Sequence, residues 1–179
     1  AALRYGANAV YLSGRGPNLR AGAQGFAPDE LPQAARRAHA VGARVYYCLN
    51  SLPHQRHLRD VEAAIDEADA AGMDALIVAD PGVARMARRR APRLPLHVST
   101  QANTANAESA LFWQDMGAAR VNMARELDLN GIRDLVQACP GVEFEAFVHG
   151  AMCLAVSGHC LLSAWMNNRP ANLGQCTHP

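Results

Sequence analysis

The chain has 179 residues, of which 50% are apolar and 18% are charged. This balance excludes an intrinsically disordered chain and provides enough apolar material for one folded core. Seventeen Lys and Arg residues against 16 Asp and Glu residues leave a formal net charge of +1, so bulk charge does not indicate nucleic-acid binding and any contact with RNA would be local. No apolar run approaches the roughly 18 residues that cross a bilayer, and the first residues lack a signal-peptide pattern, so we expect a cytoplasmic protein without a membrane partner.

Short apolar runs alternate with helical patterns along the chain. The runs occupy residues 6–12, 42–48, 72–78, 96–100, 117–123 and 141–147, and all but the fourth begin with a glycine. We expect each of these glycines to adopt the left-handed conformation that ends a helix, and the branched and aromatic residues after it to form a strand. Between the runs, apolar residues at helical spacing predict helices that begin near Leu31 and that span residues 58–71, 106–116 and 129–139.

This alternation predicts an α/β fold in which parallel strands are joined by right-handed crossovers, with about six βα units. An open doubly wound sheet and a (β/α)8 TIM-like barrel both satisfy it. Polar residues follow several strand ends, as at the carboxyl-terminal rim of a barrel, and they favour that architecture. They are Asn50, Asp80, Gln101, Asn103, Arg125, Glu126 and His149. Because such barrels usually need about 200 residues or more, we expect an incomplete barrel over residues 1–148, with one unit upstream and at least one downstream.

The polar residues after the strands differ in what their positions suggest. Ser99, Gln101 and Asn103 follow a strand that should be buried, and unpaired polar groups are costly there, so a ligand-facing role is favoured over packing. His149 either exchanges protons in a pocket or is a hydrogen-bonded packing residue. Asp80, before Pro81, is expected to cap the next helix.

Two arginine-containing segments are candidates for contact with an anion. Arg125 and Glu126 form either a weak surface ion pair or a site where Arg125 meets a carboxylate or phosphate, which we favour. Residues 85–93 hold five arginines in nine residues. This run precedes a strand, which places it on the amino-terminal face of a barrel, so a solvated helix end is favoured over RNA binding.

Residues 149–179 form a distinct segment that contains Cys153, Cys160 and Cys176, three of the five cysteines, within 24 residues. Thiolates gathered in this way surround soft metal centres. A zinc site completed by His159 or His178, or simple burial of the thiols, are the alternatives. In a straight helix Cys153 and Cys160 would lie about 10 Å apart, so we expect a bend, at Gly158. The other cysteines, Cys48 in a strand and Cys139 before a Pro-Gly turn, are expected to be structural.

Residues 145–163 match every fixed position of the pattern E-x-F-x2-G-[SA]-x-C-x4-G-x-C-x2-S, from Glu145 to Ser163. This pattern closely resembles the signature of the peptidase U32 family. The likeness extends over the chain, through residues 18–22, Asn50, residues 80–82, 99–103 and 125–127.

The resemblance implies two kinds of activity. One is the collagenase-like proteolysis that named the family. The other is oxygen-independent hydroxylation of a tRNA wobble uridine, of an rRNA cytidine or of a ubiquinone precursor. It also implies that Cys153, Cys160 and Cys176 are three of four ligands of a [4Fe–4S] cluster, with zinc as the alternative metal. The fourth ligand would be His178 or a residue beyond Pro179.

The resemblance, rather than the spacing of the residues, implies iron–sulfur-dependent hydroxylation of RNA, tRNA first, with a small-molecule oxygen donor and a protein partner left open. His149 and Arg125 are the expected catalytic residues, and Glu145 is expected to support the cysteine loop. The expected substrate-binding residues are Asn50, Ser99, Gln101, Asn103 and Glu126. The alternatives are a peptidase, although the chain has neither an H-E-x-x-H nor a G-x-S-x-G motif, and a subunit for ubiquinone-precursor hydroxylation in which the cluster could be structural.

Overall fold

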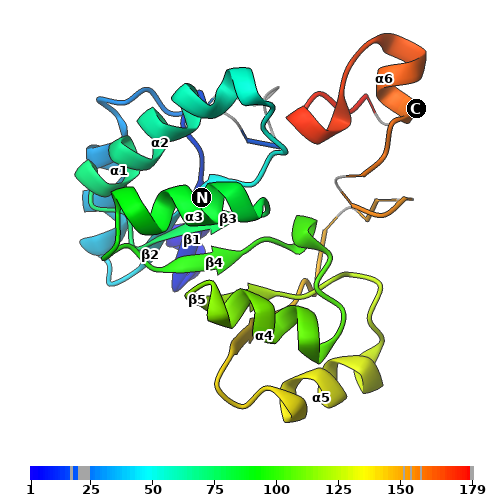
Figure 1. Ribbon diagram of the computed structural model, residues 1–179. Helices are drawn as coiled ribbons and strands as arrows, with labels where there is room; N and C mark the ends of the chain where they lie inside the picture. Colours follow the sequence, from blue (N-terminus) through cyan, green and yellow to red (C-terminus); the bar gives the residue numbers. More distant parts are fainter. Residues whose placement is uncertain (17, 20–24, 151, 154, 158, 178–179) are drawn as a thin grey trace.

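The computed structural model describes residues 1–16, 18–19, 25–150, 152–153, 155–157 and 159–177, and its centre is one parallel sheet of six strands (Figure 1). The strands lie side by side in chain order, so every connection leads to the adjacent strand. A doubly wound sheet would reverse its strand order at a switch point, and this sheet does not. The expected incomplete (β/α) barrel is confirmed. The strands are β1 Ala9–Leu12, β2 Arg44–Leu49, β3 Ala75–Val78, β4 Leu96–Val98, β5 Ala118–Asn122 and β6 Glu143–Glu145.

Five helices connect successive strands. They are α1 Leu31–His39, α2 Leu58–Ala70, α3 Pro81–Arg90, α4 Ala107–Asp115 and α5 Leu129–Ala138. Four of them lie close to the predicted positions, and the fifth, α3, is the helix that Asp80 was expected to cap. Short polar side chains begin three of them, where Asp80, Asn106 and Asp128 accept hydrogen bonds from backbone N–H groups two or three residues into the helix. The remaining elements are the short helix α6 Leu162–Asn167 and the 3-10 turns η1 Ala2–Tyr5, η2 Gln55–His57, η3 Thr100–Ala102 and η4 Ala171–Leu173.

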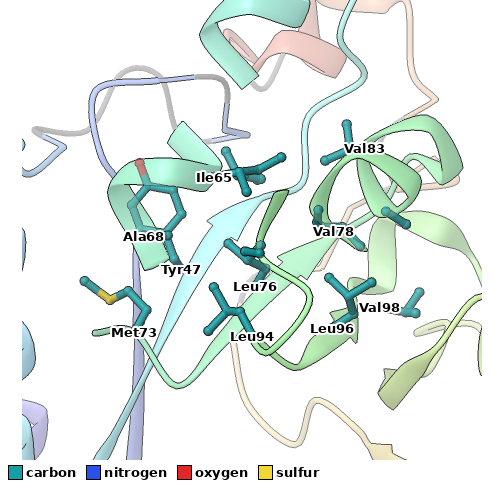
Figure 2. Packing of buried hydrophobic residues seen from close by; sticks show 14 of the residues in the cluster. Tyr47, Ile65, Ala68, Met73, Leu76, Val78, Val83, Leu94, Leu96 and Val98 are labelled. Atoms are coloured by element: carbon teal, nitrogen blue, oxygen red, sulfur yellow. The ribbon is translucent and has the colours of Figure 1, made fainter. Parts of the chain in front are cut away.

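The helices pack against one face of the sheet and form the core with it (Figure 2). On β2, Val45, Tyr47 and Leu49 belong to this core, and they alternate with residues that face the other side. Leu76 and Leu96 continue the same layer on the neighbouring strands. The opposite face, which is the inner face of the half-barrel, therefore carries the intervening residues.

The glycine before β6 differs from the prediction. Gly6, Gly42, Gly72 and Gly117 have the expected positive φ, but Gly141 does not. The turn here is closed by Val142, whose N–H donates to the carbonyl of Cys139. A Cβ on Gly141 would lie 2.8 Å from the side-chain amide nitrogen of Gln114, the end of a flexible side chain that can move aside, so neither handedness nor close packing requires glycine here. Across the described residues, no helix has the length and apolarity needed to span a membrane.

Candidate functional site

Three of the predicted site residues meet at the carboxyl ends of β2 and β4. The Asn50 amide nitrogen donates to the Ser99 hydroxyl at 3.3 Å, and that hydroxyl also accepts from the backbone N–H of Gln101 at 3.3 Å. The Asn50 side-chain oxygen accepts from the backbone N–H of Leu19 at 3.3 Å. Ser99 is only 3% exposed, so its hydroxyl ties the strand ends together. Substrate binding by Asn50 and Ser99 stays a prediction.

The turn after β4 is joined both to β5 and to the cysteine-containing segment. The Thr100 hydroxyl donates to the carbonyl of Met123 at 2.9 Å. Asn103 has a left-handed backbone, with φ 53°, and its amide nitrogen donates to the carbonyls of Gln101 at 3.0 Å and Ser157 at 3.2 Å. Asn103 therefore holds the turn between Cys153 and Cys160 against the sheet.

The carboxyl ends of β5 and β6 carry a stacked pair. The guanidinium carbon of Arg125 lies 4.8 Å from the centre of the Phe147 ring. Arg125 is half-buried, whereas Phe147 is 43% exposed. Glu126 and His149 are exposed, and within the described residues no hydrogen bond or ion pair joins either of them to the other candidates. Their roles in substrate binding and proton exchange stay predictions.

The segment after β6 crosses the whole carboxyl edge of the sheet. It leaves β6 at Phe147, its Ser157 contacts Asn103 after β4, and the carbonyl of Asn172 accepts from the N–H of Leu52, after β2, at 3.1 Å. In Figure 1 this segment, coloured orange to red, runs up the right of the view to α6, which stands apart from the sheet at the upper right. The cysteines are thus carried on the same edge as the predicted rim residues.

Two of the three clustered cysteines lie at the start of α6. The Cys160 sulfur accepts from the N–H of Leu162 at 3.4 Å, and the Cys176 sulfur accepts from the Ser163 hydroxyl at 3.7 Å. Cys153 is exposed, and among the described residues no three Cys, His, Asp or Glu side chains are placed to hold a metal ion. The donor chemistry fits a cluster or zinc, but this arrangement does not gather the three thiols. Gly158 and His178, the expected bend and possible ligand, lie outside the described residues, as do residues 20–22 of the predicted turn.

The remaining two cysteines, Cys139 and Cys48, are packed within the fold. Cys139 is 1% exposed and its thiol donates to the carbonyl of Ala107 at 3.7 Å. Cys48 lies within β2 and is half-buried. The arginine-rich run also lies where expected, at the end of α3 opposite the rim, and its Arg90 pairs with Asp66 and Glu62 of α2.

The inner face of the sheet holds a polar network that the sequence analysis missed. Arg120 of β5 donates to the Tyr46 hydroxyl at 3.3 Å and to Glu145 at 3.3 Å, and it also pairs with Glu143. The Asn122 amide nitrogen donates to the other oxygen of Glu145 at 2.9 Å. Glu145 was expected to support the cysteine loop, but the structure instead joins both of its oxygens to β5.

His97 of β4 belongs to the same inner layer. Its ring packs edge-on against Tyr46, with the ring centres 4.7 Å apart. Burial, reinforced by the charge of Arg120, lowers the pKa of His97 to about 4, so the imidazole is neutral at pH 7. The signal for this layer was the alternation of polar and aliphatic residues within strands expected to be buried on both faces.

Comparisons with known proteins match almost the whole chain and indicate one family. The model of the family described as peptidase family U32 matches residues 1–179. A tRNA hydroxylation protein P of Escherichia coli is 40% identical over 99% of this chain and 39% of its own length. A 23S rRNA 5-hydroxycytidine synthase of the same organism is 36% identical, covering 98% of this chain and 26% of its own. A collagenase of Porphyromonas gingivalis is 33% identical, covering 98% and 44%.

A solved structure of a U32 peptidase superposes on 78% of this chain and 59% of its own, with a TM-score of 0.61 and 17% sequence identity. This likeness supports the barrel fold alone. The chain spans about two-fifths of the length of the tRNA hydroxylation protein that it matches.

Proposed function

Because the chain belongs to peptidase family U32, we propose that it serves in the hydroxylation of RNA, with a tRNA wobble uridine or an rRNA base as the target. Relatives named for tRNA and rRNA hydroxylation support this proposal. The observation that carries it in this chain is the course of the cysteine segment, which lies across the edge where the polar rim residues gather. Substrate binding and thiol chemistry are thereby brought to one side of the barrel.

The rim residues have distinct parts in this proposal. Gln101 and Asn103 offer amide groups beside the strand ends, and Arg125 offers a cation beside an exposed ring. His149, which is exposed on the same edge, is the proposed proton-exchanging group. A small-molecule oxygen donor and a protein partner belong to the same proposal.

We also propose that Cys153, Cys160 and Cys176 bind metal, as a [4Fe–4S] cluster rather than zinc. All three belong to the segment that lies at the rim, and none of them forms a disulfide. The thiols are not gathered in the described arrangement, so we assign no chemical step to a cluster. Anaerobically purified full-length protein is expected to contain iron and sulfide that are lost in Cys160→Ala and kept in Cys48→Ala; zinc alone would contradict the cluster.

The function is tested in a strain that lacks the gene. Mass spectrometry of nucleosides from its tRNA and rRNA is expected to show loss of a hydroxylated nucleoside, restored by the wild-type gene but not by Cys160→Ala. An unchanged nucleoside profile would contradict the proposal.

Proteolysis is the second candidate, because one relative is a collagenase. A thiol peptidase would need a Cys–His pair within hydrogen-bond reach. Cys153 and His149 are both exposed, and no hydrogen bond joins them in the described part of the chain. Cleavage of a collagen-like peptide that needs Cys153 and no metal would favour this candidate.

A further inference from the structure

We propose that the segment from Phe147 to Thr177 is a surface for single-stranded RNA, on which Phe147, backed by Arg125, and Trp165 stack unpaired bases. This inference rests on the proposed function and adds how the substrate is held. Four features of the described residues carry it: the stacked Arg125–Phe147 pair, the exposure of Trp165, the charge of the segment and its course across the rim.

The Arg125–Phe147 contact leaves part of the Phe147 ring exposed, as a stacking site for a base requires. Arg125 covers the Phe147 ring at 4.8 Å from its centre, yet 43% of Phe147 stays exposed and the residue is not part of the hydrophobic core. An exposed aromatic ring at the mouth of a barrel offers a π-face to any base, and the adjacent guanidinium adds attraction for phosphate. Because the pair joins the ends of β5 and β6, it lies on the edge where the barrel fold places its active sites.

Trp165 offers a second ring further along the segment. It lies in α6 and is 83% exposed, whereas Trp113, the chain's other tryptophan, is 6% exposed in the core. Arg169, also exposed, follows the left-handed end of α6 at Asn168. An exposed indole ring offers a π-face on which a base can stack.

The segment lacks the carboxylates that would repel a polyanion. Residues 146–179 contain no Asp or Glu, although the chain as a whole holds 16, and Arg169 is their one Lys or Arg. A phosphate backbone that follows this segment meets no carboxylate on it. The arginine-rich end of α3, in contrast, lies on the opposite edge of the sheet, and its Arg90 is already paired with carboxylates.

The course of the segment matches an extended ligand. It is attached at β6 by Phe147, at β4 by the Asn103–Ser157 hydrogen bond and near β2 by the Leu52–Asn172 hydrogen bond. A strand of RNA that follows it would cross the rim with one base at Phe147, beside the polar residues Gln101 and Asn103. An unpaired base is required there because a duplex keeps its base faces stacked.

The test measures binding of full-length protein to an unmodified tRNA transcript and to a labelled oligouridine, separately from hydroxylation. Phe147→Ala, Phe147→Leu and Trp165→Ala are each expected to weaken binding by roughly 5- to 140-fold, the range given by base–aromatic stacking. Phe147→Trp should keep the affinity, because it keeps a π-face. Arg89→Ala, on the exposed end of α3, is the control for loss of one arginine and should leave the affinity unchanged.

Variants of Arg125 separate the contribution of charge to RNA binding from the contribution of stacking. Arg125→Ala should lower the slope of log affinity against log salt by about 0.7, the value for one phosphate contact on a single strand, whereas Arg125→Lys should keep the slope. Trp165 fluorescence, taken as the difference from Trp165→Phe, should fall when oligouridine binds.

Several results would overturn the inference. One is an unchanged affinity for RNA in both Phe147→Leu and Trp165→Ala. Another is that Trp165 is already shielded from acrylamide in RNA-free protein, because another part of the protein would then cover the segment. Its failure is distinguishable from failure of the proposed function. Variants that bind RNA normally but do not hydroxylate it would refute the stacking surface only, and wild-type binding that depends on Phe147 without any hydroxylated product would refute the function only.

Discussion

Arg120 occupies a position that aliphatic residues usually fill inside a barrel. Its side chain is 15% exposed and contacts Glu143 and Glu145 on the adjacent strand β6 and the Tyr46 hydroxyl on β2, across the inner face. Replacement by Met leaves two carboxylates close together without their cation. Because Glu143 and Glu145 are 61% and 43% exposed, we expect Arg120→Met to lower the free energy of unfolding by only about 1 kcal/mol, measured by urea denaturation. Adding Glu143→Gln and Glu145→Gln should recover part of the loss, and equal stability of Arg120→Met and wild type would contradict the role of this network.

His97 gives the same inner layer a pH dependence. Its folded pKa of about 4 lies below the ordinary value of 6.5, so the unfolded chain binds more protons between these values. Its contribution to stability is complete above pH 6.5 and is lost as the pH falls toward 4, by roughly 1.4 kcal/mol per pH unit at most. His97→Phe keeps a ring against Tyr46 without a titrating group. Its unfolding free energy should fall less steeply from pH 6.5 to pH 4.5, and identical slopes would contradict this prediction.

The residues of this network could not be predicted from the sequence as partners. Alternation indicates that Tyr46, His97 and Arg120 share a face only once the strand register is known. His97 pairs with Arg120, and Arg120 with Glu143, through parallel ladders between segments more than 20 residues apart. The cap at Asp80 was predictable because it needs only its own helix.

At the scale of elements, local signals predicted the strands and helices well. Periodicity identified each strand, and the first residues of α3 and α4 follow capping side chains that the sequence displays. The prediction at Gly141 was wrong because the turn before β6 is closed by the hydrogen bond from Val142 to Cys139 without a left-handed glycine.

The cap of α3 is a testable element-level contribution. The Asp80 carboxylate accepts from the N–H of Val83 at 2.9 Å, next to the buried core residues of the helix. Asp80→Ala should cost about 1 kcal/mol of unfolding free energy, whereas Asp80→Ser should cost less because a serine hydroxyl also caps helices. Thermal and urea unfolding of the two variants and of wild type measure the difference; an Ala variant as stable as the Ser variant would contradict the cap.

At the scale of the whole molecule, the course of the cysteine segment decides which residues form the site. The sequence indicated a cysteine-containing segment over residues 149–179 that continues the barrel domain, but not its path. Two of its attachments are hydrogen bonds to backbone carbonyls, at Ser157 and Asn172. Such contacts depend on the chain's course rather than on residue type. The resemblance identified the thiols, and the fold shows which strand ends lie beneath them.

Asn103 is the side chain that fastens this segment at its middle, so its removal should loosen the segment and leave the barrel intact. Asn103→Gly keeps the positive φ of 53° accessible while it removes the hydrogen bonds to Gln101 and Ser157. Hydrogen exchange of full-length protein should then increase in peptides covering residues 152–160 and stay unchanged in β2 and β3, because local opening is set by local contacts. Asn168→Gly, at the other left-handed asparagine of the described chain, is the matched control. Equal exchange in the two variants would show that the Asn103–Ser157 contact does not hold the segment on the rim.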